Sequence, residues 1–148
     1  MKEIKGDIWE EVEKNDGIIL IPVNHFIKKN GEAVMGRGLA LQAKTKYPDL
    51  PKIWGDAIKQ CGALVHYCRK HNVILFQVKK SWFDKADLSL INRGLAGFKF
   101  QLTEGLYDKT VFMPHIGCGN GGLLWSDVKP LIEKHLSGLN VVICDIES

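Results

Sequence analysis

Apolar runs alternate along the chain with segments in which apolar residues recur every three or four positions. The apolar runs predict six buried strands, at residues 3–4, 17–23, 63–67, 73–78, 110–113 and 141–144. The spaced apolar residues predict helices over residues 38–47, after Pro51, over residues 88–103 and after Asp127. This alternation predicts an α/β fold with three layers, α/β/α, built on a mixed, mostly parallel central sheet of about six strands.

A glycine-rich segment follows the predicted strand at 110–113. Residues 117–122 read Gly-Cys-Gly-Asn-Gly-Gly, and we expect the next helix to begin at a polar N-cap in Ser126-Asp127. Glycines between a strand and a helix let backbone N–H groups turn toward a bound anion, because no Cβ blocks its approach. No Walker motif is present, and the dinucleotide fingerprint matches only loosely. The segment predicts a phosphate-binding loop, with a purely structural loop as the alternative.

A second glycine-rich segment, residues 32–44, follows the predicted strand at 17–23 and leads into a helix. Its centre reads Met35-Gly36-Arg37-Gly38. In a parallel sheet, ligands bind beyond the carboxyl ends of the strands, and both glycine segments are expected at that edge. Two such loops suit one ligand held from opposite sides, and a diphosphate has the two phosphoryl groups that they would hold.

Size and composition indicate one soluble domain over residues 1–148. Hydrophobic residues make up 45% of the 148 and charged residues 25%, which is ordinary for a globular protein. No apolar run approaches the roughly 20 residues that span a bilayer, and the N-terminus lacks a signal-peptide pattern. We therefore expect a cytoplasmic protein without membrane contact. The net charge of +3 permits contact with nucleic acid but does not argue for it.

The four cysteines form no C-x-x-C pair, so reduced thiols are expected. Cys61, His66, Cys68 and His71 crowd into eleven residues, but their spacing matches no common zinc finger. We expect no metal site and no cofactor.

Four segments together resemble the macrodomain family, whose α/β/α fold binds ADP-ribose. They are Lys5-Gly6-Asp7-Ile8, Val23-Asn24, the loop from Val34 to Ala40, and His115-Ile116-Gly117-Cys118-Gly119-Asn120-Gly121-Gly122. The resemblance covers nearly the whole sequence. Within the family, the sequence is similar to the branch that includes DNA ADP-ribosyl glycohydrolase antitoxins, terminal ADP-ribose-protein glycohydrolases and ADP-ribose-1''-phosphate phosphatases. Within the motifs of that branch, Arg37 replaces the usual Lys and Ala43 the usual Phe.

The resemblance implies a role for several residues. Asp7 would accept a hydrogen bond from the adenine amine, with the backbone of Ile8 beside it; a turn residue is the alternative for Asp7. Asn24 would hydrogen-bond the distal ribose, and its alternative is an Asx-turn. The residues implied around the diphosphate and the distal ribose are Met35, Gly36, Arg37, Gly38, His115, Ile116, Gly117, Cys118, Gly119, Asn120, Gly121, Gly122 and Leu123.

Four side chains in and beside these loops keep an ordinary structural alternative. Arg37 could add charge or point to solvent, and His115 could bond a phosphate or be a satisfied residue at a strand end. Cys118 invites a nucleophile role, but no partner base is evident in the sequence, so a small buried thiol is favoured. Trp125 is expected to pack under the loop, with a stacking role as its alternative.

Lys79 is the catalytic residue that the resemblance implies, with Asn24 beside it at the reaction centre. The glycohydrolase branch carries a catalytic lysine in a "TK-x-x-W" context, and Lys79 with Trp82 fits that spacing. Lys80 competes for this role, because adjacent strand residues point to opposite faces. A neutral Lys79 could attack the anomeric carbon of the distal ribose, or a protonated one could stabilise the leaving group.

One departure from the branch bears on the substrate. Its protein-directed glycohydrolases place an Asp in the second loop, where this chain has Gly121. The expected activity is removal of a group from the 1'' position of ADP-ribose, as a glycohydrolase on nucleic acid or protein. The alternatives are an ADP-ribose-1''-phosphate phosphatase and a non-catalytic ADP-ribose reader. The expected partners are ADP-ribose or an ADP-ribosylated substrate, including DNA, and the expected oligomeric state is a monomer.

Overall fold

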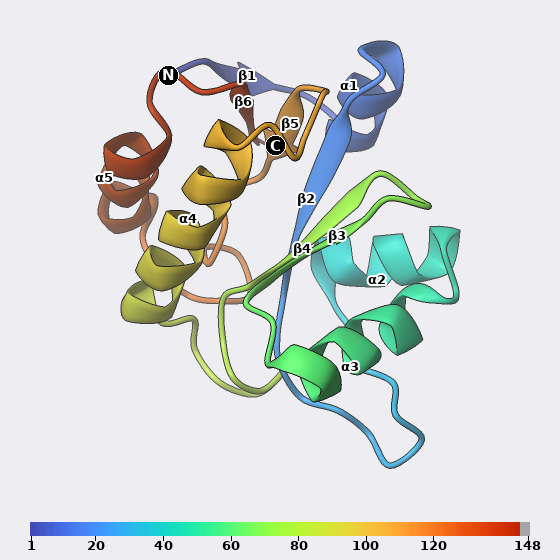
Figure 1. Ribbon diagram of the computed structural model, residues 1–148. Coiled ribbons are helices and arrows are strands. Elements are labelled where there is room, and N and C mark those ends of the chain that lie inside the picture. Colours follow the sequence, from blue (N-terminus) through green and yellow to red (C-terminus); the bar gives the residue numbers. More distant parts are fainter. Residues whose placement is uncertain (146–148) are drawn as a thin grey trace.

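A six-stranded sheet forms the centre of the molecule. A computed structural model describes residues 1–145, and its strands run in the order β1-β6-β5-β2-β4-β3 (Figure 1). Neighbouring strands are parallel except β3, which pairs antiparallel with β4. The strand bounds are β1 Glu3–Lys5, β2 Ile18–Val23, β3 Val65–Cys68, β4 Val73–Gln77, β5 Val111–Met113 and β6 Val141–Asp145. The predicted mixed, mostly parallel sheet is confirmed.

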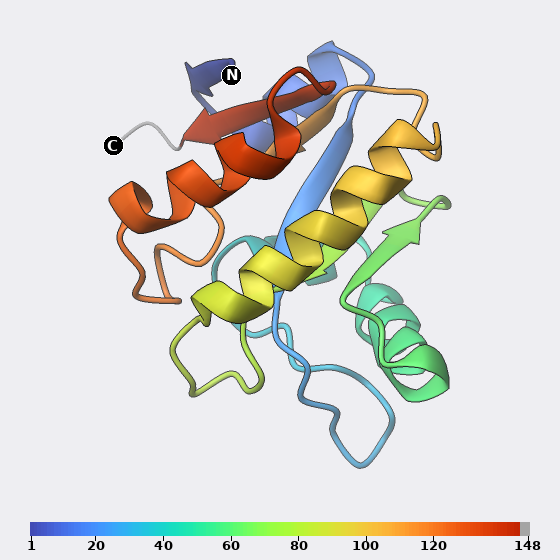
Figure 2. The ribbon, with the colours of Figure 1, turned by 60° about the vertical axis from the view of Figure 1, so that its left-hand side comes forward.

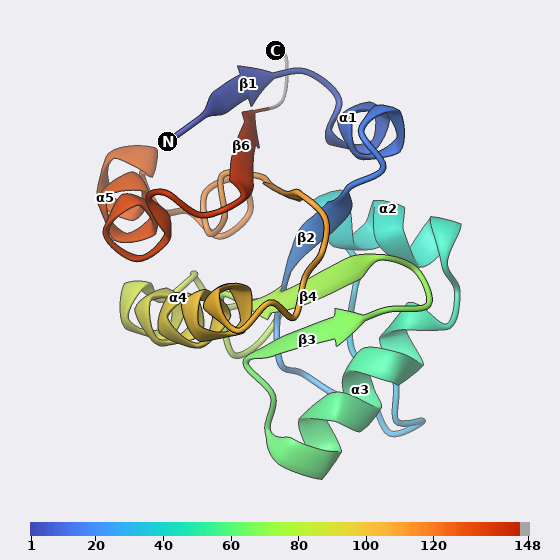
Figure 3. The same ribbon diagram turned by 45° about the horizontal axis from the view of Figure 1, so that its top comes forward.

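Helices cover both faces of the sheet. The helix bounds are α1 Ile8–Lys14, α2 Gly38–Lys46, α3 Leu50–Cys61, α4 Leu88–Thr103 and α5 Trp125–Leu136. In Figure 3, α4 and α5 lie on one side of the sheet and α1, α2 and α3 on the other. Successive side chains of a strand point to opposite faces, so along β2 Ile18 and Leu20 pack toward α4 and α5, whereas Ile19 and Ile21 pack toward the other helices. The predicted three layers are confirmed.

Three helix starts differ from the sequence expectation, one of them only slightly, since α3 begins at Leu50 and not after Pro51. The helix α1 was not predicted; Asp7 caps it, accepting hydrogen bonds from the backbone N–H of Trp9 at 2.9 Å and Glu10 at 3.3 Å. The predicted start of α5 is too late: the helix begins at Trp125, its N-cap is Leu124, and no side chain caps it. The polar N-cap expected at Ser126-Asp127 is therefore wrong. Within residues 1–145 no helix has the length and apolar character to cross a bilayer.

The carboxyl ends of the central strands carry the irregular segments that matter for function. Residues 24–37 follow β2, residues 78–87 follow β4, and residues 114–124 follow β5. In Figure 2 these three segments gather at the lower end of the sheet, where the arrow of β2 points. Backbone hydrogen bonds join them, since His25 N donates to Lys80 O at 3.0 Å and Ala86 N donates to Gly121 O at 2.9 Å.

Candidate functional site

A cleft of about 510 Å³ lies at this edge of the sheet, within the size range of small-molecule sites. Residues from the ends of β2, β4 and β5 and from both glycine loops line it. The predicted site residues that line the cleft are Asn24, Met35, Gly36, Arg37, Gly38, Lys79, His115, Gly117, Cys118, Gly119, Asn120 and Gly121. Parts of the chain almost 100 residues apart in sequence thus meet around one cavity.

Five predicted residues do not line the cleft. Ile116 is fully buried in the core, Leu123 packs against that core, and Gly122 lies under the side chain of Lys85. Asp7 and Ile8 follow β1, which β6 separates from β5 in the sheet. The Asp7 carboxylate caps α1 through its Oδ1, a role that neither the adenine-binding expectation nor the turn-residue alternative named.

The first glycine loop brings backbone N–H groups without an acceptor to the lining of the cleft. The amides of Gly36, Arg37 and Gly38 donate to no acceptor within residues 1–145. Gly38 is the first residue of α2, so the positive end of the helix dipole meets the cavity there. Its φ of +55° lies in the left-handed region, which favours glycine. This loop is built for a negatively charged ligand.

The second glycine loop curls back on itself. Leu123 N donates to Gly117 O at 3.0 Å, and Gly122 N donates to Cys118 O at 3.2 Å. The three amides between these closing bonds, those of Gly119, Asn120 and Gly121, meet no acceptor in the described part of the chain. A Cβ placed on Gly38 would lie 3.3 Å from Nδ2 of Asn120, so the two loops meet across the cleft. Six free amides on two facing loops suit a ligand with two phosphoryl groups.

Asn24 joins the cleft to the segment that follows β2. Its side chain is 7% exposed; Oδ1 accepts from Phe26 N at 2.9 Å and Nδ2 donates to Val34 O at 3.0 Å. Beneath it, the indole of Trp54 donates to the Asn24 carbonyl at 2.7 Å. The Asx-turn alternative describes the Oδ1 bond, yet the side chain also lines the cleft. An amide carries two N–H donors, so one donor of Nδ2 is left for a ligand hydroxyl.

Lys79 is half-buried at the far wall of the cleft. Its Nζ donates to the Trp82 carbonyl at 3.2 Å. Burial and the nearby Arg37 guanidinium hold the pKa of Lys79 below its ordinary value, and the Asp84 carboxylate acts in the opposite direction. Because burial and the like charge both disfavour the charged form, the neutral amine is more populated than on a surface lysine. Lys80 is exposed and does not line the cleft, so the geometry separates the two candidates.

The position of the His115 ring is set by stacking on a neighbouring aromatic side chain. Its ring stacks on Trp125 at a centroid distance of 3.7 Å and an interplanar angle of 6°. Two carboxylates approach its nitrogens, Glu3 at 3.7 Å and Asp145 at 3.6 Å, and Lys129 pairs with Glu3 at 2.6 Å. Both distances to His115 are longer than a hydrogen bond, and Nε2 of His115 has no hydrogen-bond partner within residues 1–145, so the alternative of a satisfied strand-end residue is not met. The two carboxylates disfavour an anion beside the ring. No sequence signal pointed to Glu3 or Asp145, which lie far from His115 along the chain.

Cys118 lacks the features of a nucleophile. Burial and the Asp145 carboxylate raise the pKa of its thiol, so the thiolate is disfavoured. The Sγ atom lies 3.6 Å from the Ile116 carbonyl, to which it can donate. These observations favour the buried-thiol interpretation.

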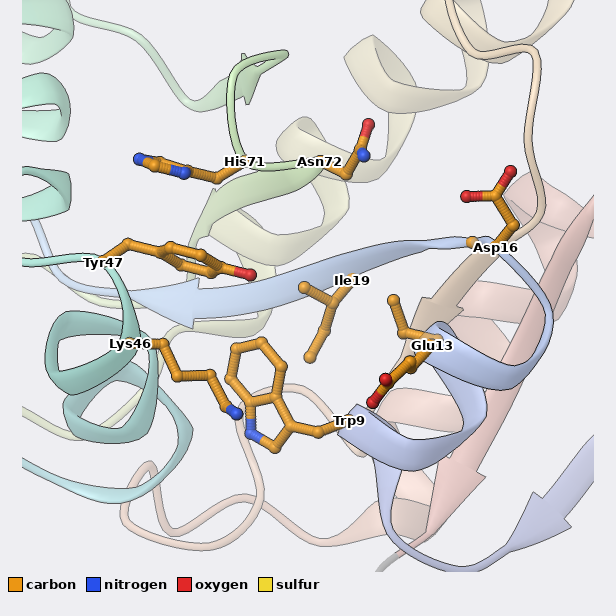
Figure 4. A pocket seen from close by; sticks show the side chains of 10 residues that line it. Trp9, Glu13, Asp16, Ile19, Lys46, Tyr47, His71 and Asn72 are labelled. Carbon is orange, nitrogen blue, oxygen red and sulfur yellow. The ribbon is translucent and has the colours of Figure 1, made fainter.

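A second, smaller hollow lies between α1 and α2, over the start of β2. Its volume is about 310 Å³, and Figure 4 shows the rings of Trp9 and Tyr47 on two of its sides. The Lys46 ammonium lies 4.9 Å from the centroid of Trp9. Carboxylates of Glu13 and Asp16 line this hollow, so it suits an anion far less than the larger cleft does. Within residues 1–145, no cluster of three or more His, Cys, Asp or Glu side chains could hold a metal ion.

Known proteins resemble the chain in sequence and in fold, although no protein-family model matches it. A DNA ADP-ribosyl glycohydrolase from Thermus aquaticus is 31% identical over 122 residues, a match that covers 76% of this chain and 34% of that protein. A DNA ADP-ribosyl glycohydrolase from Mycobacterium tuberculosis is 33% identical over 110 residues, covering 68% and 31%. The chain thus spans about a third of the length of the curated relatives that it matches.

A solved structure extends this likeness to nearly the whole chain. The macrodomain of Thermus aquaticus DarG superimposes with a TM-score of 0.76 and 25% identity, over 99% of this chain and 97% of that one. The fold, the sequence matches and the two-loop cleft agree on one family. The chain belongs to the macrodomains, in the branch of the DarG macrodomains.

Proposed function

We propose that this macrodomain binds ADP-ribose in the cleft and removes a group from its 1'' carbon, with ADP-ribosylated DNA as the substrate. The observation that carries the proposal is the position of Lys79, a half-buried amine with a lowered pKa in the same cleft as Asn24 and six free backbone amides. The DNA-directed names of the curated relatives support the choice of substrate.

In this proposal the two glycine loops bind the diphosphate and Asn24 binds the distal ribose. A fixed diphosphate and ribose hold C1'' within reach of Lys79, so attack proceeds within one complex. Binding energy from the remote diphosphate then serves the chemistry at C1''. The adenine lies toward Asp7 and Ile8, along the same edge of the sheet.

The lowered pKa favours Lys79 as a nucleophile over Lys79 as a fixed cation. The neutral amine attacks C1'', and the bonds from C1'' to the linked group and to the ring oxygen break. One amine proton goes to the linked group and the other to the ring oxygen, which leaves an imine between Nζ and C1''. Water then adds to the imine, and ADP-ribose departs as the free amine returns. The Arg37 charge serves both parts of this scheme, because it attracts the diphosphate and adds to the effect of burial in lowering the pKa of Lys79.

A turnover assay on two substrates tests the reaction class. ADP-ribosylated single-stranded DNA and ADP-ribose-1''-phosphate are offered to the same protein in parallel. Release of ADP-ribose from DNA supports the proposal, whereas release of phosphate alone would make the protein a phosphatase. Silence on both, with ADP-ribose still bound in calorimetry, would make it a reader or an enzyme for protein esters.

Substitutions of Lys79 test the mechanism. Lys79→Ala is expected to abolish turnover while ADP-ribose affinity stays within about tenfold, roughly 1.4 kcal/mol. Lys79→Arg keeps the charge but cannot form the imine, so it should be equally inactive; activity in this variant would favour electrostatic stabilisation instead. Borohydride added during turnover should attach ADP-ribose to the wild-type protein and to Lys80→Ala, but to neither Lys79 variant.

A further inference from the structure

Two large aromatic side chains stand exposed at the mouth of the cleft. Trp82 is 46% exposed and Phe83 is 66% exposed, and their rings meet edge to face with centroids 5.3 Å apart. Water-exposed aromatic pairs that are held in a fixed arrangement offer flat faces for a planar ligand. Trp82 lines the cleft, and Phe83, which contacts it, lies outside the cleft lining.

The segment that carries this pair also carries Lys79. Both ends of the segment are fixed: Val78 N donates to Val23 O at 2.9 Å, and Asp87 N donates to Val78 O at 2.9 Å. The Trp82 carbonyl accepts the bond from Lys79 Nζ at 3.2 Å. Whatever leaves C1'' during attack by Lys79 therefore departs beside Trp82 and Phe83.

Cationic side chains flank the aromatic pair. Lys80 precedes the pair in sequence and is exposed, and the side chain of Lys85, which follows the pair, comes within 3.6 Å of where a Cβ of Gly122 would be. Asp84 and Asp87 bring opposing charge to the same segment, and hydrogen bonds from Ser89 N at 2.8 Å and Leu90 N at 3.3 Å hold the Asp87 carboxylate at the cap of α4. Aromatic faces between lysines are the pattern that binds single-stranded nucleic acid, in which bases stack and phosphates meet cations.

We propose that Phe83, held by its edge-to-face contact with Trp82, stacks on a base of the ADP-ribosylated strand, while Lys80 and Lys85 contact its phosphates. This inference rests on the proposed function and adds the surface that holds the leaving group. Because Phe83 lies outside the ADP-ribose cleft, it should contribute to the binding of DNA substrates and not to the binding of small ones. It also explains why the chain leaves a phenylalanine in water beside its reaction centre.

Phe83→Ala is the variant that tests the surface. Because Phe83 is largely exposed, its removal should leave the fold intact. The expected result is a decrease of about tenfold in kcat/KM on ADP-ribosylated single-stranded DNA, with ADP-ribose affinity unchanged. That decrease is within the range for one stacked base. Phe83→Trp should restore the rate and Phe83→Leu should not, since leucine is apolar but cannot stack. Phe100→Ala is the matched control, because Phe100 is 64% exposed on α4.

Salt dependence tests the phosphate-binding lysines independently. In the double variant Lys80→Gln/Lys85→Gln, the slope of log affinity for single-stranded DNA against log salt should become shallower by about 0.7 for each phosphate that a lysine no longer neutralises. An unchanged slope would remove both lysines from the surface.

The outcomes separate this inference from the proposed function. Wild-type protein that is inactive on ADP-ribosylated DNA overturns the choice of substrate, and the inference with it. Wild-type activity on DNA that Phe83→Ala retains in full overturns the stacking surface alone. An equal decrease on DNA and on ADP-ribose-1''-phosphate would mean a general structural role for Phe83. A decrease confined to ADP-ribosylated protein would make the surface a protein-binding one.

Discussion

Substitutions at two glycines of the second loop are expected to affect different properties, ligand binding at one and stability at the other. A Cβ on Gly119 would meet no atom within 4 Å, and the residue lines the cleft. A Cβ on Gly121, two positions later, would lie 2.5 Å from the carbonyl oxygen of Gly117 and 2.9 Å from the Cβ of Ala86. Gly119→Val should therefore impair binding without affecting stability, and Gly121→Ala should impair stability directly.

The magnitudes follow from these distances. A valine at position 119 keeps the fold within about 0.5 kcal/mol, as a surface substitution does. Its side chain would push a phosphate away from the loop amides, and each hydrogen bond to a charged group is worth about 1.5–3 kcal/mol. Loss of one such bond lowers ADP-ribose affinity by about tenfold, and loss of two by about a hundredfold or more. The overpacked Gly121→Ala should lose about 1–3 kcal/mol of unfolding free energy.

Calorimetry with ADP-ribose and thermal unfolding measure the two effects on the same samples. A change of 1 kcal/mol shifts Tm by about 2–4 °C for a chain of this size, so Gly121→Ala should melt several degrees below wild type. Gly36→Val is the matched variant in the first loop, where the nearest atom to a Cβ is Cγ1 of Val34 at 4.0 Å. It should lose ADP-ribose binding at an unchanged Tm.

Three results would contradict these expectations. Wild-type affinity in Gly119→Val would show that the phosphate does not lie against this loop. An unchanged Tm in Gly121→Ala would show that the loop is more open than the distances between Gly117 and Gly121 indicate. Loss of both binding and stability in Gly119→Val would mean that position 119 supports the fold.

Two further predictions concern the groups around Lys79 and Asn24. Arg37→Gln removes a like charge and lets the pKa of Lys79 rise, so the acid limb of the kcat profile should move to higher pH; Asp84→Asn removes an opposite charge and should move it to lower pH. Shifts in the same direction for both variants would exclude Lys79 as the titrating group. Trp54→Phe leaves the Asn24 carbonyl without its donor inside the core, which should cost about 1–3 kcal/mol in chemical denaturation and weaken ADP-ribose binding. Denaturation at the wild-type midpoint would show that this bond is replaced.

Much of the fold could be predicted from periodicity. The bounds of α4 match the predicted 88–103, because buried residues recur at regular intervals along a long helix. The seven-residue α1 was missed, since only Ile8 is buried in it. Its sequence signal is the pattern Asp7-x-x-Glu10, which has the spacing of a capping box. A short helix has too few buried residues for a helical periodicity to be recognised, so its capping residues are the stronger signal in the sequence.

The candidate site could be predicted only in part. The clustered glycines indicated the positions of both loops in the sequence. A backbone can approach an anion closely only where no Cβ is in the way, so such loops are rich in glycine. The contacts of His115 could not be predicted, since Glu3 and Asp145 reach it through pairing of β1 with β6. The choice between Lys79 and Lys80 also required the structure, because the chain leaves β4 before either residue and strand alternation no longer applies.

The glycine at position 121 links the shape of the loop to the choice of substrate. An Asp there, as the sequence resemblance describes for protein-directed enzymes, would place its Cβ 2.5 Å from the Gly117 carbonyl oxygen, which is too close. This closed loop therefore disfavours a carboxylate at position 121, and its amides at 119–121 meet no acceptor among residues 1–145. A carboxylate at that point would also repel a phosphodiester strand that approaches Lys85 over the same loop. The absence of a side chain at Gly121 thus favours both an anionic ligand in the cleft and a polyanionic leaving group at its mouth.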